Sequence, residues 1–170
     1  MVDTTYSGPD LDEGVAQSGR ADVINCLLIP IRNEQILLPN TAIAEVISWQ
    51  KPEPTQDGPE WFLGMMNWRD YRVPVISFEA AIGGQVAPPS PRSRIVVLNT
   101  LNGNTNLPYI GLLSQGIPHL QVVGINAVMP NNDITVPSPT VASYALLGNQ
   151  PVMVPNIDDL ESRLLRLLSN

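Results

Sequence analysis

Few side chains in this chain of 170 residues could carry out covalent chemistry, because it holds one histidine and one cysteine. A histidine beside a cysteine or a serine can activate it as a nucleophile, so the candidates are His119 and Cys26. Each lies in an apolar run typical of a strand, and no serine stands in a Gly-x-Ser-x-Gly elbow. We therefore expect no enzymatic activity, and a hydrolase that uses His119 is the least favoured alternative.

The sequence also lacks the patterns that hold cofactors and metal ions. It contains no phosphate-binding Gly-x-x-x-x-Gly-Lys loop and no dinucleotide fingerprint. A single cysteine excludes an internal disulfide and a cysteine-based zinc site. Asp158 and Asp159 are better explained as charges at the start of a helix than as metal ligands. We expect no cofactor and no metal, and we interpret Cys26 as a small buried hydrophobic residue.

The segment 61–83 predicts an apolar hairpin that leads into a short helix. Its strands are expected at Phe62–Trp68 and Val73–Phe78, joined by Arg69, Asp70 and Tyr71. Aspartate tolerates the left-handed conformation that hairpin turns require, so Asp70 suits the turn. The turn places Arg69 at the end of an apolar surface, which favours recognition over catalysis.

Two residues inside these strands predict departures from a regular ladder. Gly64 and Pro74 are both costly in a central strand, so they indicate a bulge and a sheet edge. Neither strand alternates apolar and polar residues. We therefore expect both faces of the hairpin to be covered, as they are in a small barrel.

Composition narrows the class of protein. Charged residues make up 15% of the chain, below the average of about 25%, and 17 prolines favour many short strands. A net charge of -7 argues against a nucleic-acid partner, because phosphate contacts need clustered lysine and arginine. The start of the chain is acidic and polar, unlike a secretory signal, and no apolar run approaches the ~20 residues that span a bilayer. We expect a cytoplasmic protein without membrane insertion.

The pattern along the chain predicts one domain with a tail. Residues 1–21 are polar and aperiodic, so we expect a disordered tail followed by a domain at 22–170. Asn102-Gly103 predicts a hairpin turn between strands at Ile95–Leu98 and Tyr109–Leu113. The order strand, turn, strand, helix occurs twice, at Asn67–Ile82 and Tyr144–Leu168, which favours two small barrels of like topology.

A helix is expected near the end of the chain, at Asp158–Leu168. Asn156 is a good N-cap, and the two aspartates that follow it favour the positive end of the helix dipole. Apolar residues recur at helical spacing and are expected to cover the barrels. These residues are Ile157, Leu160, Leu164, Leu165 and Leu168.

The hairpin segment resembles the signature of CheW-like adaptor domains, in which an apolar strand ends in Asn-x-Arg-Gly and a proline-containing apolar strand follows. The residues that match are Gly64, Asn67, Arg69, Pro74, Val75 and Ile76. The order of elements in Asn25–Trp49, Arg94–Val123 and Ala142–Leu168 is also similar to the family. Asp70 departs from the usual glycine, and Ser77 stands where an aspartate is common. The resemblance implies an all-β fold of two five-stranded SH3-like β-barrels with a C-terminal helix.

The resemblance also implies a site. The glutamate of the strand after the first short helix matches Glu45, and the hairpin arginine matches Arg69, so the two are expected to pair across a groove. Asn67 is expected nearby as a neutral donor and acceptor. Apolar side chains around the pair are expected to give contact area for a partner. They are Ile43, Ile47, Trp49, Met65 and Trp68.

The function implied is a non-enzymatic adaptor that couples the cytoplasmic tip of chemoreceptors to the regulatory domain of a histidine kinase. The departures from the family motif favour an auxiliary adaptor, such as one that controls pilus-based motility. The main alternative is a small β-barrel of another class that captures a proline-rich peptide. That alternative requires Trp49, Trp61, Trp68 and a tyrosine together on one exposed face.

Overall fold

The computed structural model describes residues 22–134 and 138–170 of the chain. The tail expected at residues 1–21 lies outside these described residues. Within them the chain forms eleven strands, two 3-10 helices and two α-helices. These elements are β1 (Val23–Pro30), β2 (Gln35–Pro39), η1 (Asn40–Ala42), β3 (Ile43–Ser48), β4 (Phe62–Trp68), β5 (Tyr71–Ile76), α1 (Phe78–Ala81), β6 (Arg94–Asn99), β7 (Tyr109–Ser114), β8 (His119–Gly124), η2 (Ile125–Ala127), β9 (Val128–Pro130), β10 (Val141–Leu147), β11 (Gln150–Pro155) and α2 (Ile157–Leu168).

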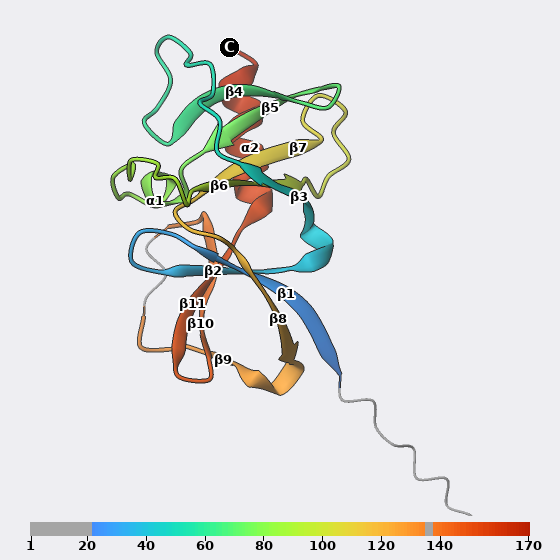
Figure 1. Ribbon diagram of the computed structural model, residues 1–170, viewed down its shortest axis with the longest axis vertical. Helices are drawn as coiled ribbons and strands as arrows, with labels where there is room; N and C mark the ends of the chain where they lie inside the picture. Colours follow the sequence, from blue (N-terminus) through green and yellow to red (C-terminus); the bar gives the residue numbers. More distant parts are fainter. Residues whose placement is uncertain (1–21, 135–137) are drawn as a thin grey trace, which may run out of the picture.

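The strands form two sheets, which Figure 1 shows as the lower and upper halves of the molecule. Sheet 1 has the order β8-β1-β2-β11-β10-β9, and sheet 2 has the order β3-β6-β7-β5-β4. The predicted all-β class with few helices is therefore confirmed. Sheet 1 holds a sixth strand beyond the five that were expected, because three residues of β9 pair with β10.

The two sheets have equivalent strand orders, because the chain consists of two halves with the same succession of elements. Each half contains a hairpin, a single strand, a second hairpin and a helix: β1-β2-β3-β4-β5-α1 and then β6-β7-β8-β10-β11-α2. In both sheets the first hairpin of one half pairs with the later strands of the other half. The joins are β2 with β11 and β5 with β7, which are parallel pairs. Neither sheet is complete without both halves, so the two sheets are interlocked.

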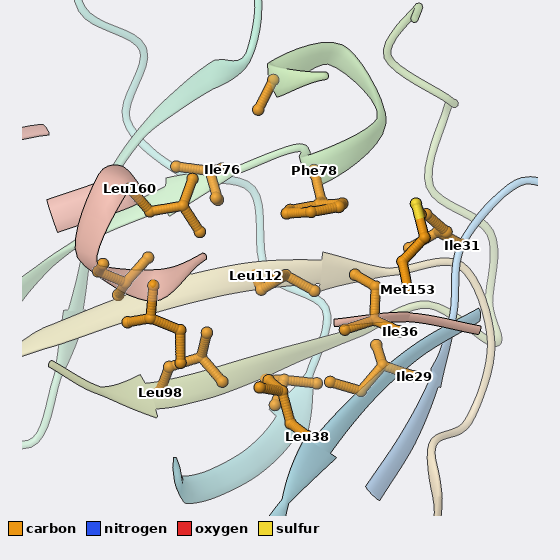
Figure 2. Close-up of a cluster of buried hydrophobic side chains, with 14 of the residues drawn as sticks. Ile29, Ile31, Ile36, Leu38, Ile76, Phe78, Leu98, Leu112, Met153 and Leu160 are labelled. Atoms are coloured by element: carbon orange, nitrogen blue, oxygen red, sulfur yellow. The ribbon is translucent and has the colours of Figure 1, made fainter. Parts of the chain in front are cut away.

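Three apolar clusters fill this arrangement. One cluster lies within sheet 1 around Leu28 and Val152, and a second lies within sheet 2 around Val75 and Ile95. The third and largest is shared by both sheets and α2. Figure 2 shows this shared core, in which Ile29 and Ile36 of sheet 1 lie toward Leu112 of sheet 2, with Leu160 of α2 and Phe78 of α1 alongside.

The central strands supply both kinds of cluster from opposite faces. On β1, Leu28 packs within sheet 1 and Leu27 packs in the shared core. On β6, Ile95 packs within sheet 2 and Val96 packs in the shared core. Because successive side chains on a strand point to opposite faces, a strand buried on both faces needs a continuous apolar run. This explains why these strands show no alternation of apolar and polar residues.

The β4–β5 hairpin differs in part from its prediction. The expected bulge is present, because the register shifts between Phe62 and Gly64, and Gly64 has a φ of 125°. β5 starts at Tyr71, so Tyr71 belongs to a strand and not to the turn. Asn67 is exposed, so the expectation that both faces of this hairpin are covered is wrong for β4.

The C-terminal helix α2 packs against sheet 2, where Figure 1 shows it running to the C-terminus. The side chain of Asn156 accepts a hydrogen bond from the backbone N–H of Asp159 at 3.1 Å, as an N-cap should. Leu160 and Leu164 are fully buried in the shared core. Leu168 is 42% exposed, so the predicted apolar stripe ends one turn early.

A carboxylate on α2 is buried, which was not predicted from the sequence. Glu161 is 1% exposed and accepts hydrogen bonds from the backbone N–H groups of Leu101 at 2.7 Å and Asn102 at 3.4 Å. It therefore ties the loop between β6 and β7 to the helix.

None of the helices in residues 22–134 and 138–170 is long and apolar enough to cross a membrane.

Gly64 tests the bulge. A Cβ at Gly64 would overlap the carbonyl oxygen of Glu53, which pairs with β4 through Met65, and the positive φ adds strain. We expect Gly64→Ala to lower the free energy of unfolding by about 3 kcal/mol, measured by urea denaturation. Gly103→Ala is the control, because it has a φ of 63° and nothing within 4 Å of the added Cβ. Its cost should be about 1 kcal/mol; equal losses would contradict the steric argument.

Glu161 tests the link between loop and helix. Glu161→Gln keeps one acceptor but places an amide donor near the two backbone N–H groups, so the free energy of unfolding should fall by about 1–3 kcal/mol. Glu60→Gln, at an exposed position, should leave that free energy unchanged. Amide hydrogen exchange should show faster exchange in the loop at residues 100–106 of the Glu161 variant. Unaltered exchange there would show that the carboxylate does not hold the loop.

Candidate partner-binding site

The hairpin tip that carries the arginine is a two-residue turn. Arg69 and Asp70 join Trp68 to Tyr71, which are partners in the register of β4 and β5. Arg69 takes a φ of 53°, whereas Asp70 does not have a positive φ. The prediction that Asp70 supplies the left-handed conformation is therefore wrong. The strained residue is the arginine itself, and its neighbours must hold it in place.

Glu45 meets this tip because sheet 2 curls on itself. β3 and β4 stand at opposite ends of the strand order, yet the indole N–H of Trp68 donates to Oε2 of Glu45 at 2.6 Å. Trp68 is only 6% exposed, so its indole N–H needs a partner within the protein. This hydrogen bond joins the two edges of the sheet and fixes the position of the Glu45 carboxylate.

Arg69 is held by two neighbours from different strands. Its Nη2 lies 3.5 Å from Oε2 of Glu45, and its Cζ lies 4.5 Å from the centroid of the Trp68 ring. The side chains of Arg69 and Glu45 are 63% and 42% exposed. An exposed ion pair contributes at most about 1 kcal/mol to stability, and the cation–π contact a similar amount. The contacts therefore orient the guanidinium more than they stabilise the fold.

Two tyrosines extend the site, and neither was among the residues predicted for it from the sequence. The ring of Tyr109 lies 4.8 Å from that of Trp68 and 4.9 Å from that of Tyr71, with edge-to-face geometry in both pairs. Tyr71 is 43% exposed. The position of Tyr71, two residues after the predicted arginine, was a signal that it belongs to the site. Tyr109 gave no such signal, because it lies on β7 and only the closure of the sheet brings it close to Trp68 and Tyr71. The aromatic group gives the hairpin tip a rigid, partly exposed surface.

The remaining predicted residues do not all lie together. Ile47 and Trp49 are partly buried and pack against the cluster inside sheet 2, to which the buried Trp68 belongs. Ile43 and Met65 pack against the shared core instead. Asn67 is exposed, and its backbone carbonyl accepts a hydrogen bond from the Gln50 side chain at 3.5 Å. The structure thus brings Glu45, Trp68 and Arg69 into contact, with the buried ring of Trp68 packed against the other two side chains.

The arrangement of the tryptophans does not match a peptide-binding groove. Trp68 is buried, and Trp61 packs against the shared core with the guanidinium of Arg163 4.6 Å from its ring. They are therefore not part of one exposed aromatic face. This is the feature that the alternative reading as a proline-rich peptide binder requires.

The two residues that could do nucleophilic chemistry lie on neighbouring strands but in different surroundings. Cys26 of β1 is buried, and burial raises the pKa of its thiol, so the reactive thiolate is disfavoured. His119 of β8 is exposed. No hydrogen bond joins the two side chains among the described residues, and the same residues contain no group of His, Cys, Asp or Glu suited to a metal ion.

Comparison with known proteins agrees with this architecture. Residues 25–164 match the family model of the CheW-like domain. The chemotaxis protein CheW of Rhizobium meliloti (strain 1021) is 27% identical over 93 residues, which is 55% of this chain and 57% of that protein. The chain therefore spans little more than half the length of that relative.

A solved structure shares the fold. The scaffolding protein TtCheW from Thermoanaerobacter tengcongensis superposes with a TM-score of 0.66 at 19% identity, over 78% of this chain and 84% of that one. The two interlocked sheets with a C-terminal helix are thus the fold of two SH3-like barrels that the family resemblance implied. With 140 of its residues covered by the family model at positions 25–164, the chain belongs to the CheW-like domain family.

Proposed function

We propose that this domain is a non-enzymatic adaptor that couples chemoreceptors to a histidine kinase in a bacterial chemosensory system. Membership of the CheW-like family and the similarity to a chemotaxis protein support this proposal. The observation that carries it is the held guanidinium of Arg69 at the hairpin tip. An exposed, oriented arginine beside aromatic rings is the kind of residue that anchors a protein interface.

We propose that the partner-binding surface centres on Arg69, Glu45 and Tyr71. Oε2 of Glu45 accepts the hydrogen bond from the Trp68 indole and also forms the ion pair with Arg69. The carboxylate therefore holds the arginine side chain in place before a partner binds. A side chain already held in its bound conformation loses less entropy on binding. Asn67, which is exposed on β4 two residues before Arg69, is a further partner contact in this proposal. The partners are the regulatory domain of the kinase and the cytoplasmic tip of the receptor.

An auxiliary role in pilus-based motility is a finer proposal that rests on the departures from the family motif. Asp70 and Ser77 are the two exchanged residues. Ser77 still accepts a hydrogen bond from the backbone N–H of Ala80 at 3.4 Å and so caps α1 as an aspartate would. Asp70 adds a negative charge at the tip, beside Arg69, where it would alter the choice of partner.

The charge of Arg69 tests the proposed surface. We expect Arg69→Glu to weaken binding to the kinase regulatory domain or the receptor tip by at least about 2 kcal/mol, since a charged anchor is lost and a like charge faces Glu45. The melting temperature should change little, because the residue is exposed. Arg92→Glu is the matched control at another exposed arginine. Binding by isothermal titration calorimetry that is equal for both variants would refute the surface.

Trp68 tests whether orientation of the arginine matters. Trp68→Phe keeps an aromatic ring but removes the N–H that holds Glu45, so we expect weaker partner binding without any change of charge. The free energy of unfolding should also fall, by about 1–2 kcal/mol, because a buried ring becomes smaller and a hydrogen bond is lost. Fluorescence-detected urea unfolding and titration calorimetry measure the two effects separately. Full partner affinity in the folded variant would show that Glu45 need not be held by Trp68.

A further inference from the structure

Strand β8 is an edge of sheet 1 with an unusual apolar surface. It pairs with β1 on one side and stands at the end of the strand order on the other. Leu120 and Val122 are 70% and 63% exposed, the two highest values among the large apolar residues of the described chain. Side chains two apart on a strand lie on the same face, so these two form one apolar surface.

The surroundings of β8 carry almost no charge. Residues 117–130 contain no lysine, arginine, aspartate or glutamate, and His119 is the one titratable side chain among them. Two more apolar residues at one end of β8 are more than half exposed: Val23, which pairs with Gly124, at 55%, and Ile125 at 56%. β8 itself carries no charged residue, and Asp22, whose backbone carbonyl accepts a hydrogen bond from the N–H of Ile125 at 3.0 Å, lies at one end of it. We call this largely apolar surface the β8 edge.

The other three sheet edges in the described residues are protected. β4 is covered by the bridge between Glu53 and Met65, with hydrogen bonds of 2.8 and 3.0 Å. β3 carries the charge of Glu45, which binds across to Trp68. β9 is three residues long and ends in Pro130, which has no N–H to donate. Short strands, prolines, charges and covering segments are the ways in which proteins prevent edge pairing, and within residues 22–134 and 138–170 β8 has none of them.

We propose that the β8 edge binds the β8 edge of a second copy of this chain. Two antiparallel β8 strands related by a twofold axis at Gln121 place Leu120 of each copy opposite Val122 of the other. This register brings the apolar faces of both strands together and satisfies backbone N–H and C=O groups of both edges. A neutral edge has no like charges to oppose this pairing, so the strand is its own complementary partner.

The dimer formed in this way is weak and depends on ionic strength. An interface built on a six-residue strand is small compared with those of permanent dimers, so association requires high protein concentration. Each copy carries a net charge of -7, and the repulsion between copies is screened by salt. Dimerisation therefore increases as salt is added, unlike an association held by ion pairs.

Analytical ultracentrifugation of the full chain tests the proposal, with concentration and salt varied. We expect a monomer–dimer equilibrium, and Val122→Lys should raise the dimer dissociation constant about a hundredfold, because each lysine then faces Leu120 of the other copy and places an unpaired charge in an apolar interface. Leu101→Lys is the matched control, since it makes the same change of charge at a residue that is 61% exposed in the loop between β6 and β7. It should leave the dissociation constant unchanged, and circular dichroism should show both variants folded.

A cross-linking experiment tests the register. Leu120→Cys and Val122→Cys proteins, mixed and oxidised, should form a disulfide-linked heterodimer faster than either protein alone, because positions 120 and 122 are opposite each other in the proposed pairing. Cys26 is buried and should not react. A chain that stays monomeric at high salt and concentration, or a dimer that Val122→Lys leaves intact, would overturn the proposal. Equal cross-linking in the mixed and separate samples would overturn the register.

Discussion

The shared apolar core between the two sheets is the constraint on which the rest of this structure depends. Central strands such as β1 and β6 are buried on both faces, so each sheet needs the other to cover it. The chain meets this requirement by placing the first hairpin of each half in the sheet completed by the other half. Folding of one sheet alone would leave its central strands exposed, so we infer that the two sheets fold together.

The candidate site is a consequence of the closure of sheet 2. Glu45 and Arg69 are on β3 and at the end of β4, which are the two edges of that sheet. Closure brings them together. The buried side chain of Trp68 then holds Glu45 through a hydrogen bond and Arg69 through a cation–π contact. The exposed pair adds little to stability, and the role in recognition proposed for it does not conflict with the fold.

The two sheets have equivalent strand orders but different edges. In sheet 2 the edge strand β3 presents a glutamate that is paired with the opposite edge. In sheet 1 the corresponding strand is β8, which presents Leu120 and Val122 to solvent. One fold, used twice in one chain, thus offers a charged, closed edge and a neutral, open one. The two edges that occupy equivalent positions therefore differ in charge and in exposed apolar surface.

The sequence by itself determined the local elements, because strand and helix signals depend on near neighbours. The apolar runs of β1 and β6, the bulge at Gly64 and the N-cap at Asn156 were all predictable from residue type and spacing. The pair Glu45 and Arg69 came from the family resemblance. Only the tertiary structure decided what depends on distant partners: Tyr109 beside Trp68, and Glu161 buried against the loop at residues 100–106. It also decided that Arg69, and not Asp70, takes the left-handed conformation, because contacts from two strands outweigh the intrinsic preference of a turn residue.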